Sequence, residues 1–273
     1  SILTGEDINS SVVQAFRWMN RAMIWQQQRS KTPQRKWIRK GKGKRGLTPA
    51  LLAGDREKHV SLEAFHETGW GRWRPFQLAF ILMNLEGLIS PDSSEREIVD
   101  LIWFPTGGGK TEAYLGLAAF TILFQRLEGE KYGVETEYGT TVLMRYTLRL
   151  LTTQQYERAS SMICACDYIR RENELDLGED PISIGLWVGS QTTYNTNEKA
   201  IRQFLALEKG QDDTYNFIAM KCPCCGTQIG PVDSPTKNER IKGLKKDDAK
   251  KRILFSCENI SCEYFDRELP LYV

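Results

Sequence analysis

Apolar residues recur along this chain at the spacing of one helix face. Near the N-terminus they fall at intervals of four, three and four residues, at Val12, Phe16, Met19 and Met23. This pattern predicts an amphipathic helix over residues 7–28. Similar arguments predict helices over residues 75–88 and 112–127, and a fourth that follows residues 145–151 and ends near residue 171.

Short apolar runs between these helices have the length of strands. Residues 98–103 form a run typical of a buried strand, residues 140–144 suit a strand by composition, and residues 182–188 alternate. Because strands and helices follow one another at these spacings, we expect a parallel sheet with right-handed crossovers. The predicted fold class is α/β, with a RecA-like sheet or part of one.

Between the first predicted strand and its helix, residues 104–111 read Phe-Pro-Thr-Gly-Gly-Gly-Lys-Thr. Glycines let backbone N–H groups approach a polyphosphate, and a helix N-terminus favours negative charge. In such a loop Lys110 contacts the β- and γ-phosphates and the Thr111 hydroxyl ligates Mg²⁺, which makes both candidate catalytic residues. We therefore predict an ATP site rather than a chance turn, with contacts from Pro105, Thr106, Gly107, Gly108, Gly109, Lys110, Thr111 and Glu112.

Gln77 follows an Arg-Pro-Phe sequence at the start of the second predicted helix. Its carboxamide offers a donor and an acceptor together, which matches the N6/N7 edge of adenine. An ordinary surface glutamine is the alternative. With the phosphate loop in the same chain, the sequence favours contact with adenine.

A second group of polar residues follows later predicted strands. Open α/β sheets bind ligands at the carboxyl ends of their strands. The candidate nucleic-acid contacts there are Thr147, Arg149, Thr152, Gln154, Gly189 and Ser190. The alternatives are a helix-start residue with a surface ion pair for Arg149 and a plain turn for Gly189.

Charge gives only local hints of a nucleic-acid partner. The 273 residues include 37 basic and 35 acidic side chains, a net charge of +2. A tract from residue 29 to 45, however, holds only basic charges: Arg29, Lys31, Arg35, Lys36, Arg39, Lys40, Lys42, Lys44 and Arg45. It is either a phosphate-contacting arm or a solvated linker. No run of 18 apolar residues or signal-peptide pattern occurs, so no membrane contact is expected.

Seven cysteines, clustered late in the chain, indicate metal ligation in a reducing cytosol. Cys164 and Cys166 point to different faces of a predicted helix and are expected to be buried hydrophobes. A Cys-x₂-Cys-Gly knuckle and a later pair predict a structural Zn²⁺ site with the ligands Cys222, Cys225, Cys257 and Cys262. Cys224 is an extra thiol that could replace a neighbour. The lysine-rich stretch between the pairs is either a phosphate-contacting loop or, preferably, a solvated insertion.

Four stretches together resemble the DrmA family, the superfamily 2 helicase component of the DISARM anti-phage system. They are residues 74–77, 103–116, 144–155 and 185–189, and the likeness covers roughly residues 60–273. The resemblance implies a RecA-like first helicase domain in which Gln77 is the Q motif, the phosphate loop is motif I, and residues 147–154 are motif Ia. It also implies an ATP-driven DNA helicase or translocase of the bacterial cytoplasm, with DrmB as partner and single-stranded DNA, or duplex with a single-stranded end, as substrate.

The chain departs from a complete helicase in two respects. After Gly189 no apolar strand ends in Asp-Glu, so the acidic box that holds Mg²⁺ is missing, as is a second RecA-like domain with an arginine finger. We therefore expect a fragment of a longer protein that turns ATP over poorly by itself. Its expected parts are an N-terminal helix and basic segment (1–60), a RecA-like core (61–215) and a zinc-ribbon-like insertion (216–270). Alternatives are a P-loop kinase, a transport ATPase, and a zinc-stabilised docking module.

Overall fold

The structure is a computed structural model, and it describes residues 10–39, 46–50, 71–103, 105, 107–128, 138–146, 149–189, 193–194, 196–233 and 240–272. The chain divides into two compact units. Unit 1 comprises residues 1–27, 60–147 and 165–182, and unit 2 comprises residues 28–59, 148–164 and 183–273. Among the helices that can be described, none combines the length and apolar character that crossing a membrane requires.

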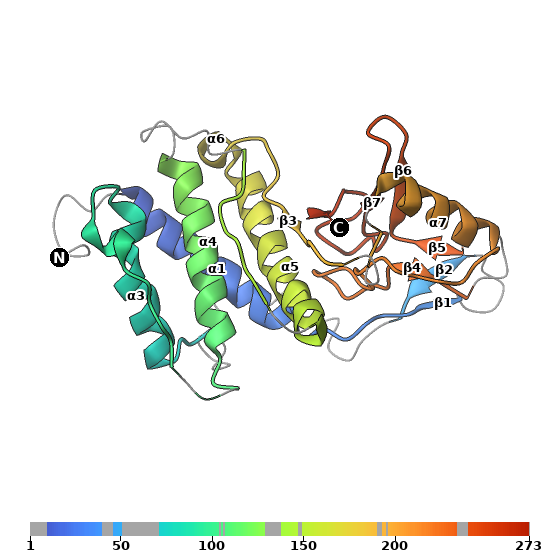
Figure 1. The fold of residues 1–273 in the computed structure, drawn as a ribbon. Helices are drawn as coiled ribbons and strands as arrows, with labels where there is room; N and C mark the ends of the chain where they lie inside the picture. Colours follow the sequence, from blue (N-terminus) through green and yellow to red (C-terminus); the bar gives the residue numbers. More distant parts are fainter. Residues whose placement is uncertain are drawn as a thin grey trace. The chain divides into compact units, whose positions relative to one another are not determined.

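Unit 1 is built from helices, whose bounds are α1 Ser10–Arg29, α3 Pro75–Ile89, the short η2 Ser94–Glu97, α4 Lys110–Glu128, the end of α5 Arg149–Glu172, and α6 Glu174–Leu177. The four long helices confirm the helical periodicities. Helices α3 and α4 lie side by side (Figure 1). Gly116 of α4 permits this close approach, because a Cβ there would stand 3.1 Å from Ile81 Cδ1 of α3 and 2.7 Å from the Trp73 ring. The Trp73 indole also donates a hydrogen bond to Asn20 Oδ1 of α1 at 2.7 Å.

A buried ion pair fixes the end of α5 in unit 1. Arg170 Nε donates to Asp167 Oδ1 at 2.9 Å, and both side chains are 6% exposed. Arg170 also donates to the carbonyls of Gly178 and Glu179, while Asp167 accepts from the backbone N–H of Ile182. The carboxylate and the guanidinium therefore hold the chain that leaves the helix.

Unit 2 combines the start of α5 with small sheets and the helix α7 Asn197–Lys209. Its strands are β1 Trp37–Arg39, β2 Leu47–Pro49, β3 Ile184–Gly185, β4 Gly230–Pro231, β5 Ile241–Lys242, β6 Leu244–Asp247, β7 Arg252–Phe255 and β8 Leu271–Tyr272. Antiparallel pairs form between β1 and β2, β4 and β5, and β6 and β7, whereas β3 and β8 pair in parallel (Figure 1).

The sheet expected around the phosphate loop is not formed in the described residues. Residues 98–103 make no strand, and Val99, Leu101 and Trp103 are 93%, 86% and 90% exposed. Residues 140–144 make no strand either, and the expected strand 182–188 shrinks to β3. A strand needs a neighbour to receive its backbone hydrogen bonds. The described part of the chain offers these runs none, so the fold seen is a mixture of helices and small sheets rather than a RecA-like parallel sheet.

Candidate metal centre and phosphate loop

The first cysteine knuckle is a tight turn closed by backbone hydrogen bonds. Cys222 N–H donates to the carbonyl of Thr227 at 2.8 Å, and Gly226 N–H donates to the carbonyl of Cys222 at 2.9 Å. Gly226 has a φ of +75°, which a residue with a Cβ rarely adopts. The turn places the sulfurs of Cys222 and Cys225 on the same side.

The second knuckle brings its two thiols to the first. Cys262 N–H donates to the carbonyl of Asn259, and Tyr264 N–H points at Cys262 Sγ, 3.5 Å away. Cys222 and Cys262 sulfurs are 3.9 Å apart, and those of Cys225 and Cys257 are 3.5 Å apart. All four sulfurs lie within 4.8 Å of one another and are buried.

This geometry fits a tetrahedral zinc ion. A Zn–S bond of about 2.3 Å puts the sulfurs of a tetrahedral site about 3.8 Å apart, close to both sulfur–sulfur distances given above. The structure thus brings together the four cysteines that the sequence singled out. Cys224 is also buried but is not among the four sulfurs that meet.

Burial and the neighbouring sulfurs shift the pKa values of these thiols in both directions. Burial raises the pKa of Cys222 and of Cys224 well above the usual thiol range. The pKa of Cys225 is lowered instead, chiefly because its sulfur accepts a hydrogen bond from Cys222. Metal binding would displace the remaining thiol protons and remove the cost of burying thiolates. Four thiolates would close the coordination shell, as in structural rather than catalytic sites.

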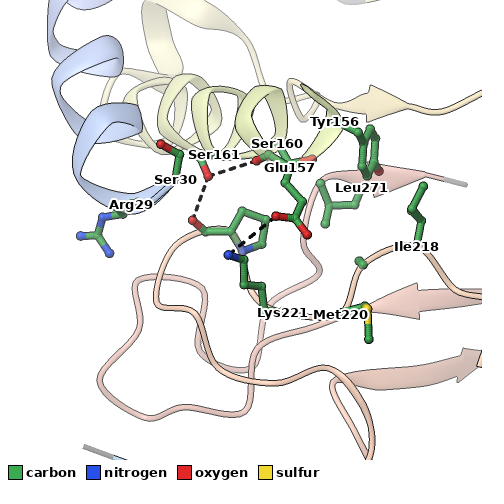
Figure 2. A pocket seen from close by; sticks show the side chains of 12 residues that line it. Arg29, Ser30, Tyr156, Glu157, Ser160, Ser161, Ile218, Met220, Lys221 and Leu271 are labelled. Atoms are coloured by element: carbon green, nitrogen blue, oxygen red, sulfur yellow. Dashed lines mark hydrogen bonds and ion pairs between the residues drawn. The ribbon is translucent and has the colours of Figure 1, made fainter. Parts of the chain in front are cut away.

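Helix α5 holds the first knuckle from one side, as Figure 2 shows. Ser161 Oγ donates to the carbonyl of Pro223 at 3.1 Å, and Lys221 pairs with Glu157 at 3.7 Å. These residues line a small pocket between the helix and the knuckle. On the second knuckle, the Tyr264 hydroxyl donates to the carbonyl of Cys164 at 2.8 Å. Cys164 and Cys166 are fully buried in α5, which confirms their interpretation as buried side chains.

The lysine-rich stretch between the knuckles carries its own counter-ions. Its ion pairs are Lys242 with Glu258, Lys245 with Asp266, Lys246 with Asp248, and Arg252 with Glu268. Acidic partners reduce the positive field that a phosphate backbone would meet. The structure therefore favours the solvated insertion over the phosphate-contacting loop.

In unit 1, the glycine-rich loop leads directly into a helix. Gly107 and Gly109 have φ angles of +81° and +89°, and Gly108 N–H donates to the carbonyl of Pro105 at 3.2 Å. Helix α4 begins at Lys110, so Thr111 and Glu112 lie in its first turn. Thr106 lies outside the described residues. The loop thus presents the start of a 19-residue helix, as a phosphate-binding loop does.

Gln77 of α3 and Arg74, the residue just before that helix, tie this loop to the rest of unit 1. The carboxamide of Gln77 is 5% exposed; its Nε2 donates to the carbonyl of Gly109 at 2.7 Å. Its Oε1 accepts from the backbone N–H of Arg74 at 2.8 Å, and Arg74 Nη1 donates to the carbonyl of Gly108 at 2.7 Å. Sequence reasoning missed the contact of Arg74, although its place before Gln77 was visible. The adenine contact of Gln77 stays a prediction.

The predicted nucleic-acid residues lie partly outside the part of the chain that can be described. Thr147 and Ser190 fall outside it. Arg149, Thr152 and Gln154 stand in the first turns of α5, where only the Gln154 side chain is described, and it is exposed. Gly189 lies in an exposed loop with open space around its Cα. Their contact with nucleic acid stays a prediction.

Fold and site together define a mixed helix–strand chain with a possible four-cysteine metal site and a glycine-rich loop at a helix start. No family model matches the chain. Over its whole length the chain is similar to the DISARM protein DrmA of Bacillus paralicheniformis, with 37% identity across an alignment of 288 positions. It spans 22% of the length of that relative. The resemblance to DrmA is thus confirmed, and it extends to the N-terminal residues that the motifs did not cover.

Proposed function

We propose that this chain is the ATP-binding part of a superfamily 2 DNA helicase or translocase that acts in DISARM-type defence of bacteria against phage. One observation carries the proposal: the loop before α4 is held by Gln77 and Arg74, the residues of the Q-motif sequence. Two motifs that are far apart in the sequence therefore meet at one helix N-terminus. The 37% identity to DrmA supports the assignment to the defence system.

Each loop residue has a proposed task. The backbone N–H groups of Gly107 and Gly109 would face the phosphates, joined by Gly108 N–H once it leaves the carbonyl of Pro105, and Lys110 would neutralise the charge that develops on them. The Thr111 hydroxyl would supply a ligand for Mg²⁺, which would neutralise phosphate charge. Gln77 would release Gly109 to read adenine, or keep its present hydrogen bond and fix the loop behind the nucleotide.

The RecA-like sheet belongs to the same proposal. Residues 98–103 and 140–144 carry exposed apolar side chains, among them Leu143 at 88% exposed, as strands do when the sheet that would cover them is missing. The chain spans about a fifth of its relative, so strands and the acidic Mg²⁺ box from the rest of such a protein would complete the site. In this proposal the core is 61–215 and the zinc-ribbon insertion 216–270, and Zn²⁺ is structural.

The partners follow from the same assignment. Thr147, Arg149, Thr152, Gln154, Gly189 and Ser190 would contact the sugar-phosphate backbone of DNA, single-stranded or with a single-stranded end. A DrmB-like protein would act with the longer protein in the bacterial cytoplasm.

Steady-state ATP hydrolysis by the longer DrmA-like protein, with and without DNA, tests the proposal. We expect DNA to stimulate turnover, and Lys110→Ala to lower it at least about 100-fold, the range for losing one contact to transition-state charge. The matched control is Lys199→Ala, at an exposed position of α7. Absence of both nucleotide binding and ATP turnover would reject the proposal of an ATP-driven helicase or translocase.

A second candidate is a zinc-stabilised docking module whose loop binds no nucleotide. It is favoured by one contrast: the four sulfurs meet within this chain, whereas the expected sheet is not formed in the described residues. Lys110→Ala separates the two, since a docking module would keep its binding to DNA or protein unchanged.

A further inference from the structure

The described part of the basic tract, residues 29–39, is attached to the first cysteine knuckle. Arg35 N–H donates to the carbonyl of Gly226 at 2.8 Å, and Gln228 N–H donates to the carbonyl of Arg35 at 2.9 Å. The Trp37 indole N–H donates to the carbonyl of Gln228 at 2.9 Å. The stretch around Arg35 thus pairs with the knuckle as an edge strand would, so this part of the tract is neither a free arm nor a solvated linker.

The contact is made at backbone distance. A Cβ on Gly226 would stand 2.5 Å from the carbonyl oxygen of Pro33 and 2.8 Å from Thr32 Cγ2. Lys221 Nζ donates to the carbonyl of Thr32 at 3.1 Å, and Gln34 Nε2 donates to the carbonyl of Met220 at 2.7 Å. The glycine therefore permits both the knuckle turn and the passage of the tract across it.

One side chain of the tract bridges both knuckles. Arg29 Nη1 donates to the carbonyl of Cys224 at 2.8 Å, and the guanidinium forms two hydrogen bonds with the carboxylate of Glu263. Cys224 directly precedes Cys225, and Glu263 directly follows Cys262. Arg29 and Glu263 side chains are only 23% and 21% exposed, and a two-pronged pair of this kind is stronger than a fully solvated one.

We infer that Arg29 is a positioning residue of the metal centre and that residues 29–37 dock on the knuckles only when the four thiols hold a metal ion. The hydrogen bonds of this docking named above fall on the knuckles or on residues within two positions of them, and the shape of such knuckles depends on metal. A segment that binds only the loaded form stabilises that form in return. The inference rests on the zinc centre of the proposed function.

Zinc release from the whole chain tests the role of Arg29. Zinc content is first measured by elemental analysis, and release is then followed with a chromogenic chelator in excess. We expect release about 10–100-fold faster in Arg29→Ala, the usual range when a residue that orients metal ligands is lost. Arg39→Ala is the matched control, because Arg39 is an exposed cation of the same tract.

Two further variants keep the test valid if Arg29→Ala folds poorly. Glu263→Gln keeps the shape of the side chain that pairs with Arg29 and removes its charge. Arg29→Lys keeps the positive charge and loses the two parallel hydrogen bonds of the guanidinium. Both should release zinc faster than Arg39→Ala. Combining Glu263→Gln with Arg29→Ala should add little, because the two substitutions break one bridge.

The effect of the metal on the docking of residues 29–37 is measured by hydrogen exchange and trypsin cleavage. Stripping zinc should expose the amide of Arg35 and the bond after Lys36 to exchange and cleavage. Equal release from Arg29→Ala and Arg39→Ala, or protection of residues 29–37 that survives stripping, would overturn this inference while leaving the zinc centre intact. A chain that contains no zinc would overturn the centre itself.

Discussion

The two candidate sites of this chain differ in how far they assemble. The metal centre in unit 2 has its four sulfurs within 4.8 Å of one another, all buried. The phosphate loop in unit 1 has the backbone angles and the helix start it needs, yet the apolar runs expected beside it stay exposed. The cysteine cluster thus has all four of its sulfurs together, whereas the phosphate loop is one part of the site that was expected around it.

The contrast follows from where each site draws its contacts. The four cysteines of the cluster lie within a stretch that runs from Cys222 to Cys262, so one short segment supplies all four sulfurs. A nucleotide site at the edge of a parallel sheet depends on strands that are neighbours in space and distant in sequence. A segment covering 22% of a longer relative can therefore contain the first kind of site whole and the second only in part.

Removal of the metal should have the largest effect. We expect stripped protein, or Cys257→Ser, to lose the structure of unit 2, because binding of structural zinc is worth about 10–16 kcal/mol and is folding energy. Segment-resolved hydrogen exchange with and without chelator measures this. Cys224→Ser is the control and should keep its zinc. An equal loss of protection in unit 1 would contradict the view that the metal stabilises unit 2 alone.

The next effect concerns the buried ion pair of unit 1. Asp167→Ala leaves Arg170 buried without its carboxylate and should lower the free energy of unfolding by about 3–5 kcal/mol. Urea titration followed by circular dichroism measures the change. Asp176→Ala, at an exposed position in α6, should stay within about 0.5 kcal/mol. A small effect at Asp167 would mean that unit 1 is not held by this pair.

A smaller loss is expected where α4 meets Trp73. Gly116→Ala places a Cβ 2.7 Å from the ring, and we expect a destabilisation of about 1–3 kcal/mol in spite of the better helix propensity of alanine. Gly87→Ala in α3 is the matched control. Its Cβ would have an ordinary contact at 3.4 Å, so it should be neutral or gain up to about 1 kcal/mol. Equal melting temperatures for the two variants would contradict this packing.

The smallest effect on stability should come from the phosphate loop. Lys110→Ala at the first position of α4 should change the free energy of unfolding by less than about 0.5 kcal/mol, measured by thermal unfolding. The same substitution should abolish ATP binding by the longer protein. A large loss of stability with unchanged nucleotide binding would assign the lysine a purely structural role.

The helices could be predicted because helical periodicity is a local property. The spacing of Val12, Met19 and Met23 anticipates the buried face of α1. Helix α7 was not predicted, although a Thr at position 196 and a Gly at position 210 mark its ends in the sequence. In the structure Thr196 caps the helix and Gly210 ends it with a φ of +65°. The runs at 98–103 and 140–144 have the composition of strands, but composition does not specify whether a run finds another strand to pair with.

The candidate sites divide in the same way. Cysteine spacing selected the four sulfurs that meet, since knuckle geometry is encoded in a few neighbouring residues. Composition could not reveal that Arg29 bridges two knuckles or that Arg35 pairs through its backbone, because a basic tract that docks and one that stays solvated look alike. Likewise, nothing in the sequence distinguished a Gln77 that reads adenine from one that holds Gly109.

Elemental analysis of the chain, purified in reducing buffer without added metal, tests most directly whether the metal centre is complete within this segment. We predict one zinc ion per chain, retained in Cys224→Ser and absent in Cys257→Ser. A folded chain that contains no zinc, or a Cys257→Ser variant that keeps it, would contradict the account.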